Sequence, residues 1–355
     1  MRNSVYRKWI SDLEWKGFSK HASFKTTHDF DWGLKYLGLN EDSNDPVHDI
    51  MEYTRFQIEH SDSYFIPPKL NPEDYNLENG QLSFPSSIRT HIENNNTARM
   101  ELYPAKNSEN IIIVVPHWNA PSESYDKICR LFQKINFSSL RVNLPYHRPR
   151  DNGEEESSTL MVSANIGMTI QAMQQSVRDI LSAVNWLELQ GYKRIGIMGS
   201  SIGSCCAFLA ACHDRRINGF FANLMSSYFG DVVWTGLSTH HIKDSIDDHN
   251  SSQPSQTPVT QRILHDIFML NSPVAFVDKI RIYNHGLKQF IVSARYDTTF
   301  LFELTGLQLN AYKEKGIPYS CKVLPCGHYS LGKSVFKYID AFYIYLFFKK
   351  LFKEN

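Results

Sequence analysis

The spacing of hydrophobic positions changes in character near residue 84. Before it, apolar residues recur with helical spacing over residues 6–13 and 47–58, and a cluster of prolines then breaks any further helix. We therefore expect residues 1–83 to form a mostly helical N-terminal extension. We expect this extension to pack on a main domain that comprises residues 84–355.

After residue 84, short runs typical of β-strands alternate with runs of helical spacing. Residues 110–115, Asn-Ile-Ile-Ile-Val-Val, are almost continuously apolar and β-branched, as in a strand that is buried on both faces of a parallel sheet. Further helices are expected at residues 125–135, 169–190, 204–212 and 301–313, and further strands at residues 140–144, 194–198, 219–225, 289–293 and 319–324. This alternation predicts an α/β fold with a doubly wound, mostly parallel sheet of eight strands.

Two segments fall outside this alternation. Residues 87–92 and 99–103 flank three asparagines, which indicates an antiparallel hairpin with an Asn-rich turn. Residues 227–271 form a long polar insertion between two expected strands. Because such insertions usually lie over the carboxyl ends of strands, where ligands bind, we expect a small lid there.

Composition limits the partners and the compartment. Hydrophobic residues make up 42% of the chain and charged residues 21%, as in an ordinary globular protein. Lys plus Arg equals Asp plus Glu at 37 each, so no overall field would steer the protein to nucleic acid. The six cysteines form no C-x-x-C pair, and the first residues lack the apolar run of a signal peptide. We therefore expect a reducing, cytoplasmic location and no nucleic-acid partner.

Residues 199–203, Gly-Ser-Ser-Ile-Gly, follow an expected buried strand and open an expected helix. They match the G-x-S-x-G pattern of a nucleophile elbow, in which Ser201 occupies the position of the nucleophile. The glycines are needed because side chains at the flanking positions of so sharp a turn would collide with the backbone. Ser200 is the neighbouring alternative, but it falls at the variable position of the pattern.

A serine hydroxyl needs a base to take its proton, and the base needs a carboxylate to hold its tautomer. Asp297 follows the expected strand at residues 289–293, and His328 follows the last expected strand, which gives the chain order Ser, acid, His. Both side chains would then reach the same edge of the sheet as Ser201. Alternatively, Asp297 caps the next helix, and His328 is an ordinary loop histidine among the 14 of the chain.

Stabilising a developing oxyanion takes two hydrogen-bond donors. The first candidate is the backbone N–H of Ile202, directly after the serine. The second would come from the loop after the strand at residues 110–115, Pro-His-Trp-Asn-Ala-Pro, through the backbone N–H of Trp118 or Asn119. Alternatively, the two prolines of this loop only shape a turn.

From about residue 85 to its end, the chain resembles the α/β-hydrolase superfamily and, within it, esterase-like and lipase-like serine hydrolases. The resemblance rests on the elbow, on the later Asp and His, and on residues 143–150, Asn-Leu-Pro-Tyr-His-Arg-Pro-Arg, which are similar to the loop after the fourth strand in esterase-like branches. The α/β-hydrolase-domain-containing protein 18 type is the subtype that the chain resembles most. The resemblance implies Ser201, Asp297 and His328 as a catalytic triad. Two positions depart from common patterns: Trp118 stands where a glycine is usual after the histidine, and Ile202 where many esterases have Met, Gln or Ala.

These features together predict a cofactor-independent hydrolase that cleaves a carboxylic ester or thioester, with a small-molecule or lipid-type acyl ester as substrate. The chain has no G-x-G-x-x-G or Walker pattern, so no nucleotide cofactor is implied. The histidines and aspartates of residues 240–249 have no spacing that would enforce a coordination geometry, so no metal is expected. The alternatives are a non-catalytic binding or scaffold protein of the same fold, and an acyltransferase that uses the same triad.

Residues 338–353 are aromatic and apolar almost all round before they become basic. A helix of this kind is normally buried, here against the sheet. The alternative is a peripheral membrane contact of this C-terminal helix, with Lys349, Lys350 and Lys353 facing anionic lipid. The apolar run at residues 341–348 is too short to span a bilayer.

Overall fold

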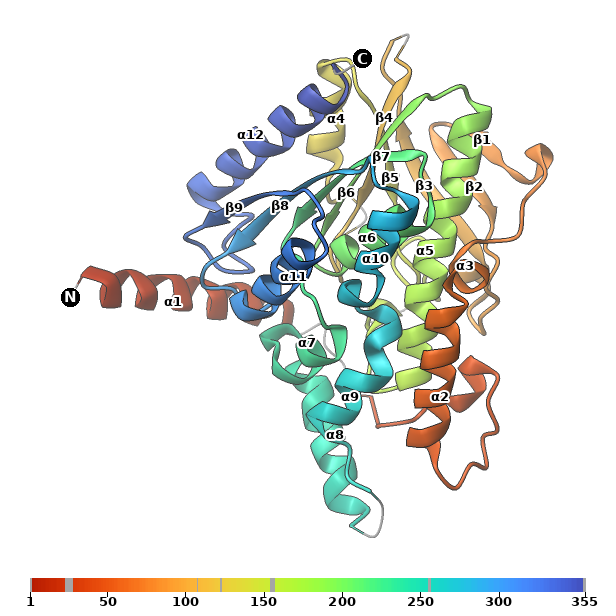
Figure 1. Ribbon diagram of the computed structural model, residues 1–355, viewed down its shortest axis with the longest axis vertical. Helices are drawn as coiled ribbons and strands as arrows, with labels where there is room; N and C mark the ends of the chain where they lie inside the picture. The colour runs from red at the N-terminus through yellow and green to blue at the C-terminus, as the bar shows by residue number, and fades with distance from the viewer. Residues whose placement is uncertain are drawn as a thin grey trace.

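The computed structural model describes residues 2–22, 28–106, 108–121, 123–153, 157–254 and 257–353. In these ranges, nine strands form one sheet in the order β1-β2-β3-β5-β4-β6-β7-β8-β9 (Figure 1). The strands are β1 (Asn76–Glu78), β2 (Gln81–Pro85), β3 (Thr97–Tyr103), β4 (Asn110–Val115), β5 (Ser138–Val142), β6 (Arg194–Ser200), β7 (Ile217–Asn223), β8 (Lys288–Ala294) and β9 (Ser320–Leu324). All pairings from β5 to β9 are parallel, and those of β1, β2 and β3 are antiparallel.

Helices cover both faces of this sheet, which confirms the doubly wound α/β fold. The α-helices are α1 (Arg2–Ala22), α2 (Pro46–Glu59), α3 (Ser61–Phe65), α4 (Asp126–Lys134), α5 (Ile166–Leu189), α6 (Ile202–His213), α7 (Phe229–Thr235), α8 (His240–Ser252), α9 (Gln261–Ile267), α10 (Val277–Tyr283), α11 (Phe302–Glu314) and α12 (Ser334–Leu351). Helices α4 and α12 meet on one face, where Phe132 packs edge-on against Phe348. Helix α6 packs on β6 and β7, with α5 and α10 beside it. The central strand β4 is therefore fully buried from Ile111 to Val115.

The expectation of eight strands was too low by one, and the expected hairpin was wrong in its first strand. Strand β3 pairs with β2, not with residues 87–92. The asparagines form a short 3-10 helix, Glu93–Asn96, instead of a hairpin turn. The cause is tertiary: Asn95 is fully buried, and its side chain donates to Gln175 Oε1 at 3.0 Å and accepts from Tyr146 N at 2.9 Å.

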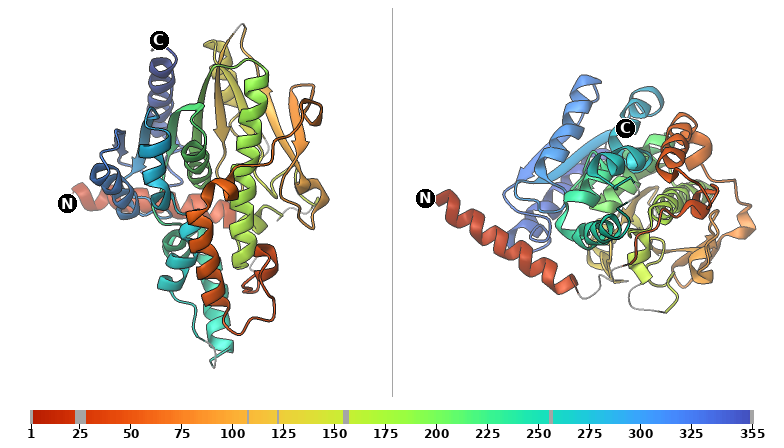
Figure 2. Two further views of the ribbon diagram at one scale, coloured as in Figure 1. Left: turned by 45° about the vertical axis from the view of Figure 1, so that its right-hand side comes forward. Right: turned by 90° about the horizontal axis from the view of Figure 1, so that it is seen from below.

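The N-terminal extension is helical, but its parts lie at opposite sides of the molecule. Helix α1 projects along the β9 side, whereas α2 and α3 lie next to α5 (Figures 1 and 2). The sheet begins at Asn76, so β1 and part of β2 fall within the range expected for the extension.

The insertion at residues 227–271, expected as an irregular polar lid, is largely helical in its described residues. It contains α7, α8 and α9 and two short 3-10 helices, Leu237–Thr239 and Phe268–Asn271. Helix α8 points away from the sheet (Figure 1), and residues 255 and 256 near its tip lie outside the described residues. The far end of α8 therefore lies away from the sheet, whereas α7, which follows β7 in the chain, packs on α8 and α9.

Helix α12 is largely apolar on all sides, but only one of its sides is buried. Phe336, Ile344 and Phe348 are buried, as expected for a helix that packs on the sheet. The opposite side exposes Tyr338 and Phe342, at 69% and 55% of their surface. Among the described residues, no helix is both long and apolar enough to cross a membrane.

A buried ion pair joins the loop after β5 to helix α5. Arg150 Nη2 lies 2.8 Å from Asp179 Oδ2, and both side chains are fully enclosed. The guanidinium also donates to the carbonyl oxygens of Asn143 and Asn95 at 3.1 and 2.9 Å, and Ser86 Oγ donates to the carboxylate at 2.7 Å. This network fixes the antiparallel part of the sheet to the helical layer.

We predict that Asp179→Ala lowers the free energy of unfolding by about 3–5 kcal/mol, because it leaves the Arg150 charge buried without its counter-ion. Urea unfolding followed by circular dichroism measures the change. Arg148→Ala is the matched control, since Arg148 is exposed and its ion pair with Asp151 should contribute less than about 1 kcal/mol. Equal losses in the two variants would contradict the prediction.

Candidate active site

Ser201 occupies the sharp turn between β6 and α6. Its φ of 54° lies in the left-handed region, which residues other than glycine rarely adopt. A Cβ atom on Gly199 would lie 2.2 Å from Gly203 O, and one on Gly203 would lie 2.2 Å from Pro116 O. Both glycines are thus required by close backbone approach, and the turn leaves the Ser201 side chain at the carboxyl edge of the sheet.

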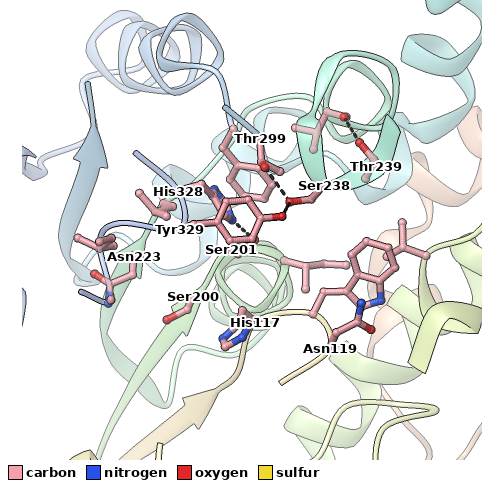
Figure 3. A pocket seen from close by; sticks show the side chains of 18 of the residues that line it. His117, Asn119, Ser200, Ser201, Asn223, Ser238, Thr239, Thr299, His328 and Tyr329 are labelled. Atoms are coloured by element: carbon pink, nitrogen blue, oxygen red, sulfur yellow. Dashed lines mark hydrogen bonds between the residues drawn. The ribbon is translucent and has the colours of Figure 1, made fainter. Parts of the chain in front are cut away.

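His328 reaches Ser201 from the loop that follows β9. Its Nε2 atom lies 3.0 Å from Ser201 Oγ (Figure 3). Its Nδ1 atom lies 3.0 Å from each carboxylate oxygen of Asp297. Ser200, the neighbouring serine, lies apart from this pair in Figure 3. The structure therefore brings Ser201, His328 and Asp297 into one hydrogen-bonded chain.

Asp297 lies in the turn between β8 and α11, where it contacts the backbone as well as the histidine. Its Oδ1 atom accepts hydrogen bonds from the backbone N–H groups of Thr299 and Phe300 at 2.8 and 2.7 Å. The carboxylate therefore orients His328 and holds its own turn, but it does not cap α11, whose N-cap residue is Leu301. Its orientation does not depend on the histidine alone.

All three residues expected as oxyanion donors, Ile202, Trp118 and Asn119, border one cavity with Ser201, but the backbone N–H of Asn119 is already engaged in a hydrogen bond. Ile202 N–H stands at the first position of α6, where a helix offers no internal acceptor. The Asn119 N–H already donates to His147 Nε2 at 2.9 Å. Burial lowers the pKa of His147 to about 4, so its ring is neutral near pH 7 and can accept this bond while Nδ1 donates to Pro145 O. A backbone oxyanion contact from Asn119 would require this bond to break.

The loop of Trp118 is joined to the insertion above it. Trp118 Nε1 donates to Ser158 O at 2.9 Å, and its ring stacks on His241 of α8 with ring centroids 5.9 Å apart. A change in the position of α8 would therefore reach the backbone of the expected oxyanion loop.

A cavity of about 490 Å³ adjoins Ser201 and His328. Apolar side chains from several segments line this cavity, including the insertion, the turn after β8 and the loops near the elbow. Among them are Val162, Ile202, Leu224, Phe229, Val232, Val233, Phe300 and Leu331. The cavity is therefore shaped to hold an apolar group next to the serine hydroxyl.

A second polar chain, which the sequence did not reveal, ties the insertion to the histidine loop. Tyr329 Oη and Ser238 Oγ are 2.6 Å apart, and Ser238 Oγ is 2.8 Å from Thr299 Oγ1 (Figure 3). Tyr329 directly follows His328, Ser238 lies just before α8, and Thr299 lies two residues after Asp297. Single hydroxyl residues in three separate loops form no sequence motif, so only the fold shows that they meet.

The cavity also borders a buried carboxyl group that the sequence did not single out. Asp340 of α12 accepts a hydrogen bond from Asn223 Nδ2 at 2.9 Å. Burial raises the pKa of Asp340 to about 7, against the lowering effect of that hydrogen bond. The backbone carbonyl oxygen of Asn223 also accepts a hydrogen bond from Ser201 N–H at 2.8 Å, so the Asn223–Asp340 pair lies directly beside the elbow.

Comparisons with solved structures identify the fold. An esterase from Pyrococcus furiosus covers 80% of this chain and 96% of its own, with a TM-score of 0.51 at 13% identity. A lipase in its open form covers 72% and 94%, with a TM-score of 0.51 at 10% identity. An acylaminoacyl peptidase from Pyrococcus horikoshii covers 72% of this chain but only 39% of its own, with a TM-score of 0.53 at 12% identity.

The chain therefore has the α/β-hydrolase fold, with nine strands in its sheet. No family model matches the sequence. It is 38% identical over 73 residues to an uncharacterized 31.7 kDa protein of the traX-finO intergenic region in Escherichia coli, a match that spans 20% of this chain and 24% of that protein.

We predict that Asp340→Asn removes a pH-dependent loss of stability. The folded-state pKa lies above the ordinary value of 3.8, so the unfolded chain releases the proton first and the wild type loses stability as pH rises from about 4 to about 7. In differential scanning fluorimetry, the melting temperature of the variant minus that of the wild type should therefore increase as the pH rises through this range. Asp12→Asn, at an exposed position, should show no such gain. Parallel curves for wild type and Asp340→Asn would contradict the prediction.

Proposed function

We propose that the protein is a serine hydrolase that cleaves a carboxylic ester or thioester through an acyl-enzyme on Ser201. The observation that carries this proposal is the hydrogen-bonded chain from Ser201 through His328 to Asp297, at the edge of an apolar cavity. Each neighbouring distance is 3.0 Å, within the reach that proton transfer to a base requires.

In this mechanism, His328 Nε2 takes the proton of Ser201 as Oγ attacks the acyl carbonyl carbon. Asp297 accepts a hydrogen bond from the Nδ1–H group of the ring and stabilises the imidazolium that forms. The oxyanion accepts hydrogen bonds from the N–H groups of Ile202 and Trp118. The imidazolium then protonates the leaving alcohol or thiol, and a water activated by the same histidine releases the acid and frees Ser201.

The apolar lining of the cavity favours an acyl chain, and hence a small-molecule or lipid-type ester, over a polar peptide as the group bound beside Ser201. Solved proteins of the same fold include a peptidase as well as an esterase and a lipase. Amide substrates therefore belong in any substrate panel. The narrower similarity to the α/β-hydrolase-domain-containing protein 18 type is part of this proposal.

Two other functions would use the same fold. A non-catalytic scaffold would show no turnover that depends on Ser201, whatever the substrate. An acyltransferase would show turnover that depends on Ser201. With an added alcohol as acceptor, however, its main product would be a new ester and not the free acid. A panel of p-nitrophenyl esters and p-nitroanilides, followed by product analysis with added alcohols, separates these functions from hydrolysis.

We predict that a fluorophosphonate probe labels the purified protein on Ser201, because Oγ attacks phosphorus, fluoride leaves and His328 takes the proton. Intact-protein mass spectrometry should show one adduct per chain. Ser201→Ala should abolish it, and Ser200→Ala should leave it in place. Absence of labelling, under conditions in which a known esterase is labelled, would refute the proposed mechanism.

We also propose a peripheral contact between α12 and anionic lipid. The exposed side of α12 carries Tyr338, Phe342 and Leu346, and its last turn carries Lys349 and Lys350. The one acidic residue of this helix, Asp340, is buried, so no negative side chain of α12 opposes such a surface. The helix follows directly on residues that border the cavity, which would bring a lipid-type ester close to Ser201.

We predict that the protein co-sediments with anionic liposomes more than with neutral ones, since a lysine near an anionic surface contributes about 1 kcal/mol. Combined substitution of Lys349→Glu and Lys350→Glu should abolish the difference. Lys69→Glu, at an exposed site on another part of the chain, is the control. Equal recovery with both liposome types, unchanged by the double substitution, would leave α12 as a packing helix only.

A further inference from the structure

The N-terminal helix α1 places a buried carboxylate beside the histidine loop. Glu14 is fully buried, although most side chains around it on α1 are exposed. A charged side chain is rarely enclosed unless other groups compensate its charge. The position of Glu14 therefore requires an explanation in terms of what it contacts.

The carboxylate of Glu14 binds the backbone on the C-terminal side of His328. Its Oε2 atom accepts from Tyr329 N at 3.1 Å, and its Oε1 atom accepts from Ser330 N at 2.9 Å. Thr298 Oγ1 also donates to Oε2, at 3.0 Å, and Thr298 directly follows Asp297. One side chain thus holds the residues that adjoin both His328 and Asp297.

Two glycines make room for this contact. A Cβ atom on Gly327 would lie 2.3 Å from the Glu14 carboxyl carbon, and one on Gly17 would lie 2.4 Å from Tyr329 Cβ. Gly327 does not adopt a positive φ, so its role here is to leave space. A further hydrogen bond joins Tyr6 Oη of α1 to Pro325 O on the same loop.

We propose that Glu14 is a positioning residue for the active site, through which α1 holds the His328 loop in its reactive geometry. This inference rests on the proposed function of Ser201 and His328, and it assigns a role to the N-terminal helix. Because a displacement of about 1 Å can cost about a hundredfold in rate, loss of these three hydrogen bonds should slow the reaction at Ser201.

The charge of Glu14 should also act on the histidine. The titratable side chains of this loop are Cys326, Tyr329 and Lys333, and those packed against it include Asp297, Tyr296, Asp340, Tyr6 and Glu14. Of these, Glu14 is the acidic side chain that α1 contributes, and it would favour the imidazolium form that arises during attack. Its removal should therefore favour the neutral ring.

The test uses Glu14→Gln in the full chain, because the amide keeps the shape but must turn its NH₂ group toward a backbone N–H or the Thr298 hydroxyl. We expect the fluorophosphonate labelling rate to fall at least about tenfold. The pH midpoint of the labelling rate should also move to lower pH, which a merely structural role would not produce. Asp12→Asn makes the same charge change at an exposed position of α1 and should leave both quantities unchanged.

Gly17→Ala provides a second variant that does not depend on the charge. The substitution favours the helix but pushes α1 away from Tyr329, so the labelling rate should fall although α1 itself is stabilised. Ser19→Ala, which is exposed on the same helix, is its control. If Glu14→Gln does not fold, Gly17→Ala decides the question.

The downfield NMR signal of the His328 Nδ1 proton gives a readout that needs no activity, and Asp297→Asn identifies it by its loss. We expect this signal to shift or disappear in Glu14→Gln and Gly17→Ala, and to persist in both controls. If the wild type is not labelled, the proposed function fails, and the NMR signal alone decides the role of Glu14. The proposal would be overturned if the His328 Nδ1 proton signal in Glu14→Gln and in Gly17→Ala were the same as in the wild type. Where labelling occurs, its rate would then also have to match that of the wild type.

Discussion

The close approach of two backbones at the elbow is the constraint on which the rest of the site depends. Strand β6 can turn into α6 within one residue only because Gly199 and Gly203 leave space for each other and for Pro116. The turn holds Ser201 at a φ of 54° and fixes its N–H on Asn223 O of β7. Parallel strands end at one edge, so the loops after β8 and β9 bring Asp297 and His328 to the same place.

The residues of this edge are held by hydrogen bonds beyond those that join Ser201, His328 and Asp297. Asp297 is fixed by two backbone N–H groups of its own turn, and the residues next to it and to His328 are fixed by Glu14 of α1. Buried acceptors that are fully satisfied in this way are rigid, because moving one costs the hydrogen bonds of several. The N-terminal helix is therefore part of the architecture of the edge, and its contacts are not confined to the surface of the domain.

Sequence reasoning succeeded where the pattern was local and failed where burial decided the outcome. The apolar run of β4 predicts a buried parallel strand, and the glycines around Ser201 predict a sharp turn, without reference to the rest of the chain. By contrast, Asn95 looks like a turn residue but is buried in a side-chain network. Glu14 looks like an ordinary acidic residue of a polar helix, as Asp12 does. Only tertiary contacts, which no spacing encodes, distinguish these residues from their neighbours.

The insertion above the sheet is mechanically joined to both halves of the site. Tyr329 Oη meets Ser238 before α8, and Trp118 of the expected oxyanion loop stacks on His241 within α8. A movement of this segment that widens the cavity must either break these two contacts or displace the residues that make them. Tyr329 is adjacent to His328 in the chain, and Trp118 is adjacent to Asn119. Because Trp118, Ser238 and Tyr329 all border the cavity, a group bound there would touch the same side chains that join the insertion to the loops of His328 and Asn119.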